Sequence, residues 1–393
     1  MIAGNVLFGT GLFFHAFLYN FYLEALGHSE AVMGHAAAAL AAGGLAVLLP
    51  AGWITDRLGS RVALIVAALA TTAGLILGAV AQRVPAIYGA AVVAGLGGGI
   101  WRVAVPPALM RLAHASARPR AFAWNVGLLV ATGGLGMAVA GSVPDWLGSW
   151  LSVERLLAIR VALLLGAIGS GAAILLFAGL PQRRLAHDES ASAGDRSATR
   201  VRLGRALLPV LLFVLVWMLG PALVAPFLNI FFTRRLEVSV GLVGVIFAVA
   251  HLVWGVCVMG SGEVATRVGT RYLLIATLAV FAPAVWGLSV ASSLGAAVGL
   301  FILQGAVSPI TNPLIDQLLL ERVPPERYGV VSSWRNVAAD VSAIIGASAG
   351  GQILAASSFG PLLVWAGVVG LVGAVGLTAA LRLTPVASIS SAP

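Results

Sequence analysis

The chain repeats part of its sequence at an offset of 210 residues. The segment from Phe17 to Arg61 aligns without a gap on the segment from Phe227 to Arg271. Identical residues recur 210 positions on from Phe17, Leu18, Phe21, Leu26, Ser29, Gly34, Gly52, Arg57, Gly59 and Arg61. Because both copies are strongly apolar, the repeat predicts two homologous membrane-embedded halves around a central axis. This architecture is more typical of transporters than of enzymes.

Hydropathy excludes a soluble globular chain. Of the 393 residues, 60% are hydrophobic and 9% are charged, and the mean hydropathy is +1.01. A helix needs about 20 apolar residues to cross the hydrocarbon core of a bilayer. Apolar windows of that order fall at 2–26, 31–51, 62–82, 86–112, 121–143, 156–180, 206–230, 239–261, 272–292, 295–320, 329–355 and 360–381. We therefore predict an all-α polytopic membrane protein with twelve transmembrane helices, six in each pseudo-symmetric half.

One long polar stretch divides the chain. Residues 181–205 are rich in Ser, Gly, Ala and charged residues, a composition that favours a flexible linker. We predict an N-terminal six-helix bundle over residues 1–180, a cytoplasmic linker over 181–205 and a C-terminal six-helix bundle over 206–393.

The placement of arginine predicts the orientation in the membrane. The sequence contains no lysine, and most of its arginines fall in the loops on one side of the predicted spans. The few arginines expected on the other side are Arg83, Arg155, Arg160, Arg234 and Arg235. By the positive-inside rule, both termini are expected in the cytoplasm, and the chain is expected as a multi-pass protein of the cell (inner) membrane. The same bias explains the sequence pI near 11.1, so nucleic acid is not an expected partner.

Nothing in the sequence supports catalysis or a resident cofactor. Cys257 is the single cysteine, and the scattered histidines have no metal-ligand spacing. We found no Ser-His-Asp constellation, no pair of catalytic carboxylates and no phosphate-binding loop of the Walker type. We therefore expect no enzyme activity, cofactor or metal. The expected partners are a small-molecule substrate and the lipid bilayer, and a monomer is the default state.

The two halves carry the same loop motif. Gly52-Trp-Ile-Thr-Asp-Arg-Leu-Gly-Ser-Arg61 follows the second predicted span, and Gly262-Glu-Val-Ala-Thr-Arg-Val-Gly-Thr-Arg271 follows the eighth. Both resemble the G-x-x-x-D-R-x-G-x-R signature of the major facilitator superfamily. With twelve spans and a central linker, the resemblance covers essentially the whole chain. It implies the fold of that family and transport by alternating access.

The resemblance also implies coupling and gating residues. The aspartate of the motif, here Asp56, is expected to contact the start of span eleven, between Ser332 and Arg335. Arg57, Arg61 and Arg335 are further coupling or gating candidates. The second copy of the motif has Thr266 in place of the acid, so no equivalent contact is expected there. Asp316 is a candidate proton site, and Asp340 is a further candidate for coupling or gating.

In this family the first, fourth, seventh and tenth spans line a central cavity. Arg102, in the middle of span four, is the main candidate for substrate binding, because an arginine there costs about 2.5–3.5 kcal/mol on insertion scales and needs a compensating partner. That partner is either an anionic substrate or an acid on another helix. The other substrate-binding candidates are His15, Tyr19, Asn20, Trp101, Trp217, Asn229, Ser308 and Asn312; His251 and Trp254 could also approach the cavity.

We expect a secondary active transporter that moves a small organic, anionic solute, with Arg102 as the anchor and H⁺ as the coupling ion. The alternative is export of amphipathic drugs or lipid-like compounds, in which the apolar and aromatic faces bind the solute and Arg102 forms a structural ion pair. Span five lacks the Gly-Pro step usual in the drug/proton antiporters of the family, which weakens that alternative. A non-transporting sensor on the same fold is a third interpretation.

Overall fold

The computed structural model describes residues 1–114, 118–181, 196–324 and 327–383. The side chains of a few further residues inside helices, Asp56 among them, are outside this description. All regular structure in the described part is helical, and twelve helices or helix pairs are long and apolar enough to cross a membrane. The predicted fold class is therefore confirmed.

The first six spans are single helices. They are α1 (Ile2–Ala25), α2 (Glu30–Leu58), α3 (Ser60–Val80), α4 (Val84–Leu112), α5 (Arg118–Leu151) and α6 (Arg155–Ala178). Their lengths, between 21 and 34 residues, are sufficient for a spanning helix at 1.5 Å per residue.

The second half begins with a broken span. Span seven consists of α7 (Arg196–Val224), the 3₁₀ turn η2 (Ala225–Phe227) and α8 (Leu228–Arg235). The break coincides with Pro226, which has no N–H to give to the helical hydrogen-bond ladder. The remaining spans are α9 (Val240–Val268), α10 (Thr270–Val290), α11 (Leu294–Leu320), α12 (Tyr328–Ala356) and α13 (Phe359–Leu383).

The linker between the halves is shorter than expected. Helix α7 already begins at Arg196, so residues 196–205 are helical and not flexible coil. Four of these ten residues are arginines, and arginine is a good helix former. Residues 182–195 lie outside the described part, and the division into two domains stays a prediction.

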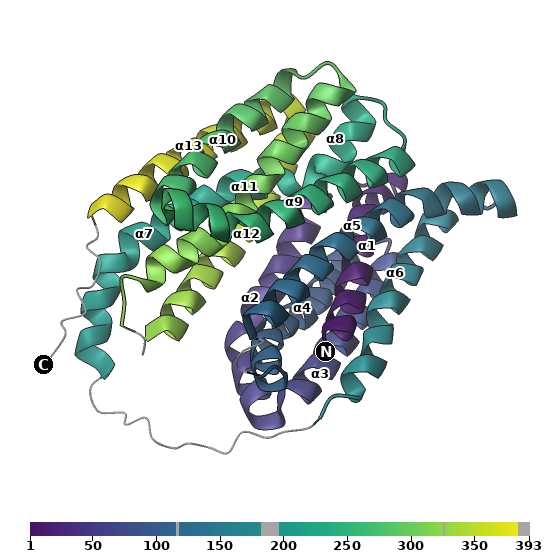
Figure 1. Cartoon of the computed structure of the whole chain (residues 1–393). Coiled ribbons are helices and arrows are strands. Elements are labelled where there is room, and N and C mark those ends of the chain that lie inside the picture. Colours follow the sequence, from purple (N-terminus) through teal and green to yellow (C-terminus); the bar gives the residue numbers. More distant parts are fainter. Residues whose placement is uncertain (115–117, 182–195, 325–326, 384–393) are drawn as a thin grey trace, which may run out of the picture.

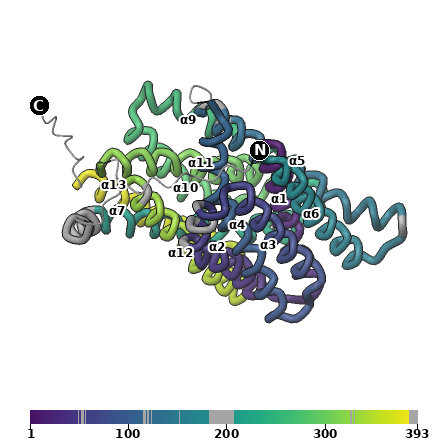
Figure 2. Tube along the Cα trace, turned by 90° about the horizontal axis from the view of Figure 1, so that it is seen from below, coloured from purple at the N-terminus to yellow at the C-terminus, as the bar shows by residue number. Residues whose placement is uncertain are grey.

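The two bundles stand side by side, with the purple-to-blue helices α1 to α4 in the first and the teal-to-yellow helices from α7 onward in the second (Figure 1). The view from below shows α12 of the second bundle beside α2 of the first (Figure 2). Successive spans run in opposite directions. Helix α2 meets α3 at one end of the molecule, where α6 also ends, and we call this end the linker side. Helix α1 meets α2 at the opposite end, which we call the far side.

Two helix pairs form the most extensive contacts between the halves in the described part of the chain, α2 with α12 and α5 with α9. Glycines bring the backbones into contact in both pairs. A Cβ on Gly34 would overlap the carbonyl oxygen of Ala347, and one on Gly351 would lie 2.5 Å from that of Glu30. In the other pair, a Cβ on Gly244 would lie 2.6 Å from the oxygen of Met137, and one on Gly141 would lie 2.6 Å from that of Val240.

These contacts are related by the same offset as the sequence repeat. Gly34 corresponds to Gly244, and Gly141 corresponds to Gly351, in each case 210 positions apart. The two pairs of contacting helices are therefore equivalent interfaces, and the pseudo-symmetry predicted from the sequence holds in three dimensions.

The far side carries an ion cluster between the halves. The Arg234 guanidinium in α8 donates from Nε to Glu24 Oε1 of α1, at 2.8 Å, and from Nη1 to Glu30 Oε1 of α2. Glu24 and Arg234 are themselves 210 positions apart. All three side chains are partly exposed, so the cluster contributes modestly to stability.

Candidate functional site

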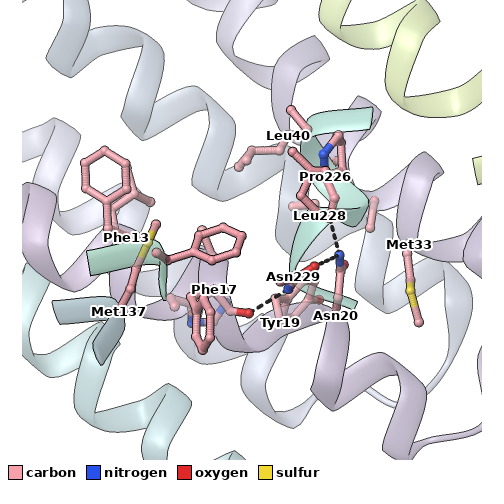
Figure 3. A pocket seen from close by; sticks show the side chains of 18 of the residues that line it. Phe13, Phe17, Tyr19, Asn20, Met33, Leu40, Met137, Pro226, Leu228 and Asn229 are labelled. Carbon is pink, nitrogen blue, oxygen red and sulfur yellow. Dashed lines mark hydrogen bonds between the residues drawn. The ribbon is translucent and has the colours of Figure 1, made fainter. Parts of the chain in front are cut away.

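A cavity of about 510 Å³ lies between the halves, in the interior of the bundle. Spans one to five, seven, eight and ten contribute its lining (Figure 3). Its polar lining residues are His15, Tyr19, Asn20, Asn229, His251, Trp254, Gln304 and Ser308. No arginine, aspartate or glutamate is among the described residues that line it, and the rest of the surface is aliphatic or aromatic. A cavity of this size and composition suits a small organic molecule.

Aromatic rings from three helices form one wall. The His251 ring of α9 packs against Phe13 of α1 and Trp254 of α9, with ring centroids 5.7 and 4.6 Å apart. Phe301 of α11 packs against Phe247 and Trp254, at 4.7 and 5.4 Å. Since π-systems stack in this distance range, the wall can accept a flat apolar group.

Trp254 is fixed in this wall by its surroundings. Its indole Nε1 donates to the carbonyl oxygen of Ile302, at 2.8 Å. The ring passes so closely over Gly305 of α11 that a Cβ there would overlap it. The absence of a side chain at Gly305 thus makes room for the indole.

Helix α1 supplies a polar strip to the cavity. The rings of His15 and Tyr19 are stacked with centroids 5.1 Å apart. The Nδ1 atom of His15 and the hydroxyl of Tyr19 are both buried and lack a hydrogen-bond partner in the described part of the chain. Unsatisfied buried polar atoms are rare in folded proteins and need a physical explanation.

Two asparagines close the cavity toward the far side. Asn20 donates from Nδ2 to Asn229 Oδ1 at 3.2 Å and to the carbonyl oxygen of Pro226 (Figure 3). Asn229 in turn donates from Nδ2 to the carbonyl oxygen of Phe17, at 2.8 Å. These bonds join α1 to η2 and α8. The helix break at Pro226 leaves its carbonyl available as an acceptor.

Arg102 does not line the cavity. Its guanidinium forms a bidentate ion pair with Asp340 of α12, with Nη1 and Nη2 each 2.9 Å from a carboxylate oxygen. The Arg102 side chain is 43% exposed, whereas that of Asp340 is 7% exposed. This is the second of the two predicted arrangements, an ion pair with an acid on another helix. It also joins α4 of the first half to α12 of the second.

A glycine lets the arginine reach across. A Cβ on Gly44 of α2 would lie 2.8 Å from Arg102 Nη2, so the guanidinium passes over the bare backbone of α2 on its way to Asp340. The predicted substrate residue Arg102 and the predicted gating residue Asp340 therefore act as one pair between the halves, on the linker side of the cavity.

The other predicted site residues fall into two groups. His15, Tyr19, Asn20, Asn229 and Ser308 line the cavity, whereas Trp101, Trp217 and Asn312 do not. Trp101 donates to Asn5 Oδ1 inside the first half, and Asn5 donates to Asn125. Trp217 is 1% exposed and packs against Phe281. Both tryptophans thus lie outside the described lining of the cavity, and their part in substrate binding stays a prediction.

The predicted gating residues lie on the linker side. Asp316 Oδ1 is 3.1 Å from Arg335 Nε, an ion pair within the second half between α11 and α12. Arg57 and Arg61 flank the turn between α2 and α3. The predicted contact of Asp56 with span eleven lies outside the described side chains and stays a prediction. The described residues contain no group of His, Cys, Asp and Glu that could hold a metal ion.

Sequence reasoning missed most of the aromatic wall and Gln304. Phe247, His251 and Trp254 follow one another at four and three residues on α9. On α11, Gln304, Gly305 and Ser308 lie three, four and seven residues after Phe301. Such spacing places each set on one helical face. His251 and Trp254 were expected as residues that could approach the cavity, whereas Phe247, Phe301 and Gln304 were not.

Comparison with known proteins agrees with this architecture. The profile of the Major Facilitator Superfamily matches residues 1–347 and, in a second match, residues 210–392. No curated protein matches the chain.

Solved structures with the same fold cover nearly the whole chain. A D-xylose-proton symporter is 15% identical with a TM-score of 0.76, and the match covers 98% of this chain and 96% of the symporter chain. A bacterial homologue of the human lysosomal transporter Spinster, in an inward-facing and occupied conformation, is 13% identical with a TM-score of 0.76, and the match covers 97% and 96%. A point mutant of the nucleoside transporter NupG is 14% identical with a TM-score of 0.75, and the match covers 96% and 98%.

The family profile covers both halves, and the twelve spans surround a central cavity. The chain therefore belongs to the major facilitator superfamily and has the fold of its transporters.

Proposed function

We propose that this chain is a secondary transporter for a small, uncharged, amphipathic organic solute, which binds in the central cavity. The composition of that cavity carries the proposal: its described lining offers rings and a few neutral hydrogen-bonding groups but no arginine, aspartate or glutamate. An ionised solute would lose its hydration there without gaining an oppositely charged partner.

The two walls of the cavity favour a molecule with two kinds of surface. A flat apolar part would pack on the wall formed by Phe247, Trp254 and Phe301. A hydroxyl or amide group would face α1, near the unpartnered atoms of His15 and Tyr19. Nucleosides and xylose, after which two transporters of the same fold are named, are uncharged molecules, which supports an uncharged ligand.

The anionic solute expected from the sequence is less well supported. Its anchor was Arg102, whose two terminal nitrogens are already occupied by Asp340. The amphipathic alternative needs Arg102 only as an ion pair, which is what the structure contains. We therefore prefer this second substrate class, with the direction of transport left open.

We further propose that transport is coupled to protons. The chain would lie in the cell membrane as a monomer, with both termini in the cytoplasm. The D-xylose-proton symporter of the same fold and the placement of arginine on the linker side support these points. Candidate proton sites are His15 and His251 in the described lining of the cavity and Asp340 in its ion pair with Arg102.

Binding to the detergent-purified protein tests the proposal. The probes are neutral aromatic amphiphiles, nucleosides, pentoses and organic anions, and the readout is the melting temperature. We expect a neutral compound to raise the melting temperature of the parent and to lose most of this effect in Trp254→Leu and Phe301→Ala. Trp365→Leu is the matched control, because Trp365 is 56% exposed on α13, outside the cavity.

The same panel can overturn the proposal. If an organic anion stabilises the parent and not Arg102→Ala, whereas the aromatic variants still bind it, the solute is anionic and is bound by Arg102. If neutral compounds stabilise the parent and the two wall variants equally, the central cavity is not their binding site.

A further inference from the structure

A second cavity lies on the linker side of the first half, separate from the central one. It has a volume of about 250 Å³ and is lined by Gly59, Ser60, Arg61, Ala108, Arg111, Leu112, Leu180 and Pro181. The turn between α2 and α3 and the ends of α4 and α6 form its walls. We propose that this cavity binds a phosphate group, either of an anionic lipid or of a small soluble phosphate.

Arg61 and Arg111 line this cavity. Arg111 donates from Nη1 to the neutral Ser60 Oγ, at 3.2 Å. Neither Arg61 nor Arg111 forms an ion pair with a described residue, in contrast to Arg102, Arg234, Arg267 and Arg335. Two positive charges at one small cavity repel each other, and an anion between them would offset this repulsion.

The backbone of the cavity wall adds to the positive potential. Helix α3 starts at Ser60 and has neither a side-chain cap nor an acid in its first turn. Its first N–H groups and the positive end of its dipole are therefore available to an anion. Gly59, which precedes the helix, has a φ of +85°, so a side chain there would be strained. These features alone would be weak, but they coincide with the two arginines.

The second half provides an internal comparison. Helix α10 starts in the same way after Gly269, with a φ of +91°. The residue equivalent to Arg111, 210 positions on, is Glu321. Here Thr270 donates to Gln317 Oε1 at 3.3 Å, and Gln317 donates to Glu321 Oε1 at 2.9 Å.

The chain thus occupies this corner of the second half with its own hydrogen-bonded side chains, one of them acidic. In the first half, the positions of Gln317 and Glu321 are taken by Pro107 and Arg111, and a basic cavity remains. The difference is specific to one half and does not follow from the fold, which both halves share. It points to a ligand that only the first half binds.

The chemistry of the site selects an oxyanion with several acceptor oxygens. A phosphate group can accept from both guanidinium groups and from the helix N–H groups at once. The cavity lies where α2, α4 and α6 end and α3 begins, and lipid headgroups meet a membrane protein at the ends of its spans. Arginines near a membrane surface each contribute about 1 kcal/mol to the binding of anionic lipids.

Native mass spectrometry of the delipidated protein can measure lipid binding at this site. The probes are phosphatidylglycerol and, as a net-neutral lipid, phosphatidylcholine. A second arm measures the melting temperature with inorganic phosphate against chloride at equal ionic strength. The variants are Arg61→Ala, Arg111→Ala and Arg111→Glu, which copies the second half. Arg111→Lys keeps the charge, and Arg271→Ala is the matched control at the position equivalent to Arg61.

We expect Arg61→Ala and Arg111→Ala each to weaken binding of the phosphate-bearing probe about fivefold to tenfold. Arg111→Glu should abolish this binding, Arg111→Lys should retain most of it and Arg271→Ala should leave it unchanged. Losses confined to phosphatidylglycerol identify a lipid as the ligand, and losses confined to inorganic phosphate identify a soluble one.

Equal binding of both probes by the parent, Arg61→Ala and Arg111→Glu would overturn the assignment. So would a uniform loss in Arg271→Ala, because it would reveal a general effect of net charge. The melting temperature of each variant without ligand separates a binding defect from a folding defect. None of these residues lines the central cavity, so the test is independent of the proposed transport function.

Discussion

The two interfaces between the halves are alike at one end and different at the other. On the far side, α2 packs on α12 and α5 packs on α9 through equivalent glycines, Gly34 with Gly351 and Gly244 with Gly141. Nearer the linker side, the contact to α12 runs through the ion pair of Arg102 with Asp340. The contact of α5 with α9 there is apolar, with Gly127 beside Met259 and Gly255 beside Val130.

Equivalent positions explain how the difference arises. Gly44 and Trp254 are 210 positions apart, as are Arg102 and Asn312. In the first half the glycine leaves space for a guanidinium that reaches the other half. In the second half, Trp254 of α9 fills the equivalent space and packs against α11 of the same half. One duplicated structure has thus become a charged connection on one side and an aromatic wall on the other.

This difference between the ion-paired and the apolar contact indicates which interface can open. A pair with a guanidinium that is 43% exposed can exchange its partner for water at small net cost. An apolar interface cannot part without exposing its surface to water or to the solute path. We therefore expect the halves to separate along α2 and α12 on the linker side while α5 and α9 stay together.

The largest effect is expected from a side chain at the glycines of the far side. Gly351→Val and Gly141→Val should each destabilise the protein by about 3 kcal/mol, because the added atoms meet backbone that cannot move aside. SDS-induced unfolding in mixed micelles measures this. Gly299→Val is the control, because a Cβ there meets nothing within 4 Å. A large cost at only one of the two positions would show that the two glycine interfaces of the far side are not equivalent.

Removal of the two partners of the ion pair should have unequal effects. Arg102→Ala leaves the nearly buried Asp340 carboxylate without a partner and should cost about 2–3 kcal/mol. Asp340→Ala leaves a guanidinium that water already reaches and should cost about 1 kcal/mol. The double variant should be more stable than Arg102→Ala in the same unfolding assay.

Arg267→Ala is the control for this series, since Arg267 pairs with Glu263 at the surface and its removal should change stability by less than about 0.5 kcal/mol. Equal costs for the two single variants would mean that the pair is uniformly solvated and would remove our reason for placing the opening at α12.

A smaller effect is expected at Gly44. Gly44→Ala should cost about 1 kcal/mol, because the new methyl group meets the movable end of Arg102 and not backbone. The cost should disappear in the Arg102→Ala background. Gly98→Ala on α4, where a Cβ meets nothing within 4 Å, should be neutral or slightly stabilising, since alanine favours the helix. A cost of Gly44→Ala that persists without Arg102 would place its cause elsewhere in the helix packing.

The smallest effect is expected at the ion cluster of the far side. Arg234→Gln should lower stability by about 0.5–1 kcal/mol at low salt and by less at high salt, because its partners are partly exposed and screened. Melting curves at two salt concentrations measure this. Salt-independent destabilisation would show that the cluster is more buried in the membrane than its exposure indicates.

The fold could be predicted because it depends on local properties. Hydropathy located span seven at 206–230, and the structure has it at Leu207–Arg235. The break at Pro226 follows from proline chemistry alone. A flexible coil was expected over 196–205, where the structure has the start of α7, because the arginines around Arg200 do not end a helix.

The site could be predicted only in part, because partners depend on packing. The cost of burying Arg102 showed that it needed a partner, yet Asp340 lies 238 positions away. In the same way, Asn20 and Asn229 were identified as polar residues of the cavity, and their bond to each other was not. The wall around His251 depends on how far α9 reaches into the cavity, which the spacing on one helix does not reveal.

The pairing of Glu24 with Arg234 has a consequence for how the two halves recognise each other. These residues occupy the same place in the repeat and meet at the pseudo-twofold axis. An assembly of two copies of the first half would bring glutamate against glutamate at that axis, and two copies of the second would bring arginine against arginine. Complementary charges at this one position therefore favour the pairing of one copy of each half over the self-association of like halves.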